Sequence, residues 1–420
     1  MGKTIYEKII ARASGKTNVC SGEITWVTPD LIATTDLNWH QRETFLEKVG
    51  LESVPKPEKI VAVVDHHTEQ LSMPEGAEHL RAFRAWTKRN AGVHFYDTGR
   101  GGLQNQVLAE KGHVRPGMLV VGDDPEGETW GGLGAFAKCA DQDMWMAMAI
   151  DKVWLEVPEV MRYNLTGNFQ RGVLSIDLRY KLHKEFGTAL SKVVEFGGPV
   201  IDEMSIDGRM NLCSALYLSG TYGIVNPDQK TIEYIQSRTG EPFEPLVSDI
   251  DAQYAEIRAY DVSELEPQVA FPPSPTNTKP VSAAEGIPVH EASIGACTSG
   301  RLEDLRIAAE ILKGKKVHPA VRLLITPISQ EIQMQAIEEG LIKIFIEAGA
   351  IICIPSCGTC PGHIGRLAAG ENCITTSTVN YPGRMGSREA TIYLASPATV
   401  AASALEGKIA DPRKFLGKER

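Results

Sequence analysis

Short apolar runs that end near glycine, aspartate or asparagine recur along the chain, and each adjoins a stretch compatible with a helix. These runs are Ile60–Val64, Met118–Val121, Val321–Ile325 and Ala350–Ile354. Short apolar runs bounded by turn residues are typical of strands. Their alternation with helical stretches predicts an α/β fold with largely parallel sheets.

The ends of these runs carry polar residues that can do chemistry. In α/β folds, functional side chains gather where strands end and loops begin. His66, Asp124 and Cys357 each follow such a run. We therefore expect the functional residues to lie at strand ends.

Prolines mark the clearest break in the pattern. The segment Phe271–Pro280 is rich in proline, which cannot continue a helix or an inner strand. We expect it to separate the final third of the chain from the rest, and we expect a weaker boundary near Val157–Tyr163. The sequence thus predicts three α/β domains, over residues 1–160, 161–272 and 281–420.

Composition narrows the classes of protein. The chain has 420 residues, of which 43% are hydrophobic and 23% charged, so it can build sizeable cores. A net charge of -10 without any run of lysine or arginine disfavours a nucleic-acid partner. The sequence also predicts no membrane partner and a cytoplasmic location, because no apolar run approaches about 20 residues and the start lacks a signal segment.

Cysteines are the most informative residues. Eight in 420 are too few for a disulfide scaffold, so thiols kept reduced are expected. Cys297 lies in the glycine-rich turn 295–300, and Cys357 and Cys360 lie in the turn 356–362. Three thiolates from two loops suit an iron–sulfur cluster. Because a [4Fe-4S] cluster normally takes four cysteines, three would leave one iron open as a Lewis acid.

Spacing alone leaves other interpretations open. A single Cys-x-x-Cys is shared by zinc sites and redox pairs. Zinc would need a fourth ligand, which Cys353 or Cys373 can offer, although structural zinc sites usually use two matched pairs. Free cysteine also packs as a small hydrophobe, which we expect of Cys353, Cys139 and Cys213. On this evidence the cluster and the alternatives, zinc and redox together, are about equally supported.

Longer segments add a resemblance. The chain resembles the aconitase superfamily, and within it the large-subunit family of the 3-isopropylmalate dehydratases and homoaconitases. The segments that carry the resemblance are Val63–His66, Val114–Gly122, Gly131–Phe136, Ile294–Asp304, Ser356–Cys360, Pro382–Gly386 and Leu394–Ser403.

The resemblance implies a hydro-lyase (dehydratase) that uses a [4Fe-4S] cluster on Cys297, Cys357 and Cys360. Such enzymes dehydrate and rehydrate hydroxy acids, with histidine–carboxylate pairs managing protons and arginines holding carboxylates. Family members of this length lack the C-terminal swivelling domain. A separate small subunit of the swivel-domain type is therefore the expected partner.

Several positions depart from the family pattern. Glu126 stands where the family has histidine, Asn105 replaces another histidine, and Ser214 and Leu218 replace asparagine and glutamate. Val379 replaces a carboxylate-binding arginine, although Arg384 remains. A charge left unpaired on burial is costly, so these losses look coupled. They predict a hydroxy acid outside the usual substrates.

The resemblance and the strand ends together predict the site residues. The expected catalytic residues are Asp65, His66, Asp124 and Glu126, and the expected substrate-binding residues are Arg384, Ser299 and Asn105. His66 can donate a proton to a departing hydroxyl, whereas without the motif a structural histidine would be favoured. Ser299 is also expected to cap a helix that opens at Leu302.

Two other functions remain open. The same cluster could support a different elimination or isomerisation, or could recruit a sulfur or nitrogen ligand. Alternatively, the protein could carry the cluster for a regulatory or structural purpose.

Overall fold

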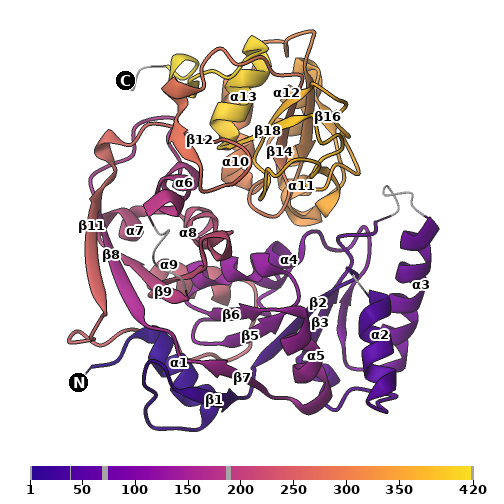
Figure 1. The fold of residues 1–420 in the computed structure, drawn as a ribbon, viewed down its shortest axis with the longest axis vertical. Helices are drawn as coiled ribbons and strands as arrows, with labels where there is room; N and C mark the ends of the chain where they lie inside the picture. The colour runs from indigo at the N-terminus through magenta and orange to yellow at the C-terminus, as the bar shows by residue number, and fades with distance from the viewer. Residues whose placement is uncertain (1, 38, 69–73, 186–190, 418–420) are drawn as a thin grey trace. The chain divides into compact units, whose positions relative to one another are not determined.

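The computed structural model describes residues 2–37, 39–68, 74–185 and 191–417 (Figure 1). Its contacts divide the chain into two compact units. Unit 1 comprises residues 1–166 and 189–260, and unit 2 comprises residues 167–188 and 261–420. The predicted α/β class with largely parallel sheets is confirmed. The division into three domains stays a prediction.

A five-stranded parallel sheet organises the first part of unit 1. Its order is β4 (His94–Tyr96), β3 (Ile60–Val63), β2 (Leu31–Thr35), β5 (Leu119–Gly122) and β6 (Phe136–Cys139). Its helices are α1 (Ile5–Ser14), α2 (Trp39–Lys48), α3 (Pro74–Arg89), α4 (Gln104–Glu110), α5 (Asp141–Ile150) and the 3-10 helix η2 (Pro125–Leu133). Because all five strands run the same way, their carboxyl ends share one edge.

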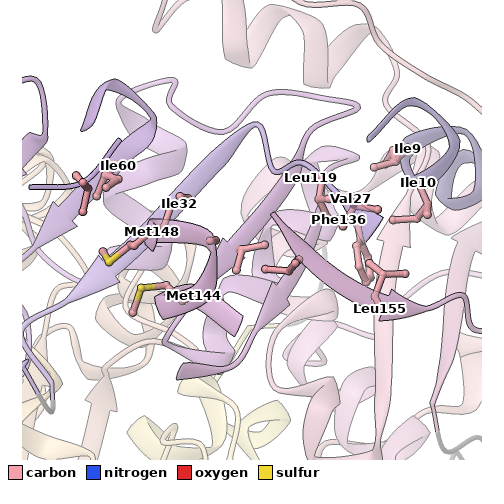
Figure 2. Packing of buried hydrophobic residues seen from close by; sticks show 14 of the residues in the cluster. Ile9, Ile10, Val27, Ile32, Ile60, Leu119, Phe136, Met144, Met148 and Leu155 are labelled. Atoms are coloured by element: carbon pink, nitrogen blue, oxygen red, sulfur yellow. The ribbon is translucent and has the colours of Figure 1, made fainter. Parts of the chain in front are cut away.

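Apolar side chains from the strands of this sheet, from the helices and from β7 form a core against it. Figure 2 shows Ile10 of α1, Phe136 of β6 and Leu155 among the gathered side chains, with Met144 and Met148 contributed by α5. Leu155 belongs to β7 (Val153–Glu156), which pairs antiparallel with β1 (Ile24–Val27). The buried faces hold the strands rigidly, so the loops at their carboxyl ends start from fixed points.

A four-stranded sheet completes unit 1. Its order is β10 (Thr221–Val225), β9 (Lys192–Gly197), β8 (Val160–Thr166) and β11 (Glu256–Asp261). The associated helices are α7 (Pro199–Glu203), α8 (Ile206–Cys213), α9 (Gln229–Gln236) and the short η3 (Leu216–Ser219). Strand β10 and helix α8 pack against η2, as does β6, so η2 joins the four-stranded sheet to the five-stranded sheet.

Unit 2 contains a seven-stranded sheet. Its order is β13 (Thr278–Pro280), β12 (Gln268–Ala270), β18 (Thr391–Ala395), β17 (Asn372–Thr375), β14 (Glu291–Gly295), β15 (Arg322–Thr326) and β16 (Ile351–Ile352). Its helices are α6 (Ser175–Glu185), α10 (Leu302–Leu312), α11 (Gln330–Glu338), α12 (Leu341–Ala348) and α13 (Pro397–Glu406). The five strands from β18 to β16 are parallel, and α13 packs against α10 and β14 (Figure 1).

The proline-rich segment Phe271–Pro280 is part of this sheet. Its last residues form β13, which pairs antiparallel with β12. Pro280 is tolerated because β13 is an edge strand, where one missing N–H removes no inner hydrogen bond. The prolines thus mark a hairpin turn within unit 2. Across the residues described, no helix has the length and apolar character needed to cross a membrane.

Candidate functional site

The predicted site residues fall into two groups, one in each unit. The histidine group consists of Asp65, His66, Asn105, Asp124 and Glu126, all in unit 1. The cysteine group consists of Cys297, Ser299, Cys357, Cys360 and Arg384, all in unit 2. Each group is held together by its own sheet.

His66 lies just beyond the carboxyl end of β3, as the sequence predicted. The turn that carries it is tied to the end of β2 by Asp36. The Asp36 carboxylate accepts the backbone N–H groups of residues 65, 66 and 67 at 2.9, 3.0 and 2.6 Å. Three charge-assisted hydrogen bonds therefore fix the turn. Sequence reasoning missed Asp36, although it follows a buried strand like the other site residues.

The His66 ring is held between carboxylates. Its Nδ1 lies 2.6 Å from Asp65 Oδ1, and its Nε2 lies 3.7 Å from Asp124 Oδ2. The second oxygen of Asp65 accepts the N–H of Gln104, at the start of α4, at 2.9 Å. The imidazole is thus oriented from one side by a fixed carboxylate, with a second carboxylate on the other side.

Burial and the neighbouring charges set the pKa values of His66 and Asp65. Burial disfavours a charged His66, but the carboxylates of Asp65, Asp124 and Asp36 outweigh burial and raise its pKa to about 10. Burial also raises the pKa of Asp65, against the pull of His66. We place the shared proton on His66, because Asp65 already accepts a backbone N–H. The surrounding carboxylates therefore favour the charged form of His66.

Asp36, Asp65 and His66 also lie close enough to hold a metal ion, with ligand atoms within 4.8 Å of one another. Their oxygens, however, already accept hydrogen bonds from the turn, from α4 and from the imidazole. We assign this group to hydrogen bonding.

Asp124 and Glu126 begin η2 but bind different partners. Asp124 caps η2 by accepting the N–H of Glu126 at 2.9 Å, and burial raises its pKa to about 6 despite His66. Glu126 is only 3% exposed, and its Oε2 accepts a hydrogen bond from Ser214 Oγ at 2.9 Å. The two substituted positions of the sequence analysis, Glu126 and Ser214, are therefore in direct contact.

Asn105 and Glu128 complete this side of η2. The side chain of Asn105 donates from Nδ2 to Thr129 Oγ1 at 3.2 Å. The backbone carbonyl of Asn105 accepts from the Trp130 indole at 2.8 Å. Glu128, which sequence reasoning missed, is buried and accepts the N–H of Tyr217 at 2.8 Å. Burial raises the pKa of Glu128 well above its usual range. Because it stands in the irregular stretch after Glu126, the sequence carried no signal for its burial.

Cys297 follows β14 in a turn that needs glycine. Gly295 has φ +123°, and a Cβ there would lie 1.9 Å from the Thr326 carbonyl oxygen. Cys357 opens the short η6 (Cys357–Thr359), and Cys360 follows directly. All three thiols are buried. The two loops thus start from strand ends of one parallel sheet, as predicted.

The cysteine group has the chemistry of a metal site. Arg384 Nη2 donates to Cys360 Sγ at 2.9 Å, and Cys297 Sγ lies 3.3 Å from Thr378 Oγ1. A hydrogen bond from Cys357, aided by the charge of Arg384, lowers the pKa of Cys360 well below its usual range. The thiolate is the form that binds metals. Ser299 Oγ and Thr359 Oγ1 are buried without a partner in the part of the chain described, so the loops also hold unsatisfied donors. These residues fit an iron–sulfur cluster.

Ser299 does not cap the helix it precedes. Helix α10 opens at Leu302 as predicted, but its N-cap residue is Arg301. The Asp304 carboxylate accepts the N–H of this N-cap residue at 3.1 Å. The Ser299 hydroxyl is therefore left for another role.

The remaining buried cysteines are part of the core. Cys353, Cys213 and Cys373 are buried as small hydrophobes, and Cys139 is partly buried. Burial raises the pKa of both Cys353 and Cys373, the two candidates for a fourth zinc ligand. A raised pKa is consistent with thiols packed in the core.

The α/β unit 2 carries three buried cysteines in two turns, and their chemistry is that of a metal-binding protein. Comparison with known proteins identifies the family: the model of the aconitase family (aconitate hydratase) matches residues 7–407, and the chain belongs to this family. It is 45% identical to the 3-isopropylmalate dehydratase large subunit 1 of Methanopyrus kandleri, over 99% of this chain and 100% of that protein. It is 42% identical to the 3-isopropylmalate dehydratase large subunit of Heliobacterium modesticaldum, with the same coverage.

Solved structures are also similar to this chain. One of them is the holo-form of Thermococcus kodakaraensis aconitase X, with a TM-score of 0.49 and 12% sequence identity over 84% of each chain.

Proposed function

We propose that the protein is the large, catalytic subunit of a [4Fe-4S] hydro-lyase that adds or removes water on a hydroxy acid. The observation that carries the proposal is the buried cysteine group, with Arg384 hydrogen-bonded to the Cys360 sulfur. The proposal is supported by family membership and by relatives named as dehydratase large subunits.

Cys297, Cys357 and Cys360 would hold the cluster, one cysteine on each of three irons. When bound, a cluster with one open iron supplies Lewis-acid chemistry that polarises a substrate oxygen. The protein contributes the dry surroundings, because all three thiols are buried. It also contributes the charge of Arg384, which favours the thiolate of Cys360.

His66 would donate a proton to the leaving group. In the dehydration direction the C–O bond breaks, His66 donates its proton to the departing hydroxyl, and water leaves. The carbon–hydrogen proton passes to a base, and we propose that this base comes largely from the partner subunit. Asp65 orients the imidazole, Asp124 stabilises its charged form, and Glu126 serves as a second acid–base group.

Arg384, Ser299 and Asn105 would bind the substrate. Arg384 Nε is buried without a hydrogen-bond partner among the residues described, so the guanidinium keeps a donor for a carboxylate. The Ser299 hydroxyl is likewise unsatisfied. Because Val379 stands where the family has a second arginine, we propose a hydroxy acid other than citrate or isopropylmalate, with one carboxylate fewer or a smaller polar group.

The partner would be a small subunit of the swivel-domain type. The relatives are named large subunits, and the alignment covers them in full. A cytoplasmic location remains part of the proposal.

The test is anaerobic co-expression with a candidate small subunit, followed by assay of hydration and dehydration on a panel of mono-, di- and tricarboxylic hydroxy acids. We expect a brown protein whose activity is lost on oxidation and restored by iron and a reductant. A colourless preparation with full activity would contradict the cluster. A brown preparation that turns over none of these acids would favour a different chemistry of the open iron.

A further inference from the structure

Arg42, in the five-stranded sheet region of unit 1, carries a charge on a fully buried side chain. It lies on α2, and its side chain is 0% exposed. An arginine cannot lose its charge on burial, so it is retained only where several acceptors surround it.

The acceptors around Arg42 come from three elements. Its Nη2 lies 2.6 Å from Asp123 Oδ2 and 3.2 Å from Asp141 Oδ1 at the start of α5. Its Nη1 donates to Thr34 Oγ1 at 3.1 Å and to the Thr35 carbonyl. The guanidinium therefore joins the carboxyl end of β2 to the residues that follow β5.

Hydrogen bonds of Asp123 also link Arg42 to Asp36 and Asp65, the two carboxylates that hold the His66 turn and ring. Its Oδ2 accepts the Thr35 N–H at 2.6 Å and the Thr35 hydroxyl at 2.9 Å, which fixes the residue just before Asp36. Its Oδ1 accepts from the Gln104 side chain at 3.3 Å. The Gln104 backbone N–H in turn donates to Asp65.

Asp123 also directly precedes Asp124, whose carboxylate faces His66 Nε2. Asp123 is thus linked to all three carboxylates around the imidazole. It is linked to Asp36 through Thr35, to Asp65 through Gln104, and to Asp124 as its neighbour in the chain. Without Arg42, Asp123 would be a buried charge without its cation, and the residues it binds would lose their common anchor.

We infer that Arg42 is a positioning residue for the His66 proton donor, acting through Asp123 on Asp36, Asp65 and Asp124. The inference deepens the proposed function and rests on it where it concerns catalysis. The geometric part concerns the ionisation of His66 alone, and it can be tested without substrate or partner.

The experiment replaces the whole ion pair, so that the net charge of the region does not change. In the double variant Arg42→Met, Asp123→Asn, the histidine titration is followed by NMR on protein labelled at histidine, and His66→Gln identifies the His66 signal. The matched control is Arg162→Met, Glu195→Gln. It removes another ion pair of unit 1, one with a fully buried carboxylate, between β8 and β9.

We expect the pKa of His66 to fall by one or more in the Arg42 double variant, which is about a tenfold change in its dissociation constant. The control should leave the His66 titration within the wild-type error. Arg42→Lys keeps the buried charge but cannot reach all four acceptors, so it should shift the titration in the same direction by less. This variant also keeps the test usable if the double variant fails to fold.

An unchanged His66 titration in both Arg42 variants would overturn the inference. In the assembled enzyme we further expect kcat to fall about tenfold while KM stays within about twofold. If the titration shifts but no hydro-lyase activity exists in the wild type, the positioning role stands and the proposed function fails. If the wild type has hydro-lyase activity and the titration does not shift, the proposed function stands and the positioning role of Arg42 fails.

Discussion

The histidine group of unit 1 and the cysteine group of unit 2 occupy equivalent places, at the carboxyl ends of parallel strands, but differ in how they are satisfied. In unit 1, His66, Asp65 and Asp124 bind one another and the surrounding backbone. In unit 2, buried hydroxyls of Ser299 and Thr359 have no partner among the residues described, and Arg384 stabilises a thiolate. Buried polar groups normally find partners.

The histidine group and the cysteine group should therefore respond to different changes. Within the histidine group, Asp65, His66 and Asp124 bind partners in unit 1, so their ionisation should be set by the protein and by pH. The cysteine group carries unsatisfied donors and a stabilised thiolate, so its properties should depend on what binds there.

The largest effect is expected from loss of one cluster ligand. Cys360→Ala should abolish iron binding and lower activity at least about 10³-fold, because a Lewis acid contributes several kcal/mol to such a reaction. The measurements are iron and sulfide content, visible absorbance and turnover. Cys373→Ala, which removes a buried thiol of the same sheet, is the control and should keep the cluster. Equal iron content in both variants would refute the assignment of the ligands.

The next effect concerns the proton donor. His66→Gln should lower kcat by about 10²–10⁴-fold, the usual contribution of a general acid, while iron content stays at the wild-type level. The control is His113→Gln, another partly buried histidine of unit 1, whose pKa is lowered to about 4 by desolvation, so that it is neutral. Loss of iron in His66→Gln would show that the two groups are not independent.

The same histidine makes stability depend on pH. The pKa of His66 is about 10 in the folded protein and about 6.5 when unfolded, so the folded state holds the extra proton between these values. Its stabilisation is complete below pH 6.5 and is lost as pH rises through 10. We expect the free energy of unfolding to fall by about 1 kcal/mol per pH unit over this window. Thermal unfolding from pH 7 to 9.5 measures it.

His66→Gln is the control for that slope, because glutamine does not titrate. The variant should unfold with a flatter pH dependence than the wild type over the same window. A wild-type slope that matches the variant would mean that the imidazole is not held charged by Asp65 and Asp124.

The contrast also explains what the sequence could predict. Runs such as Ile60–Val64 placed His66 at a strand end, because parallel strands leave their carboxyl ends at one edge. The glycine-rich turns 295–300 and 356–362 were also recognisable in the sequence as the two loops that carry the buried thiols. The hydrogen bonds of Asp36 and Arg42 were beyond prediction, because they join residues distant in sequence whose partners only the fold selects. The role of Phe271–Pro280 was also missed, since an edge strand tolerates proline.

The smallest effect tests the pair that replaces the family residues. Glu126→Gln should lower kcat about tenfold if Glu126 moves a proton. Ser214→Ala removes only the hydrogen bond to Glu126 Oε2, so it should leave kcat within about threefold and cost about 1–2 kcal/mol of stability, measured by urea unfolding. The two variants thus separate proton transfer from support of η2. If both lower kcat equally while the stability of each matches the wild type, Glu126 acts only through its contact with Ser214, and proton handling in the histidine group rests on His66, Asp65 and Asp124.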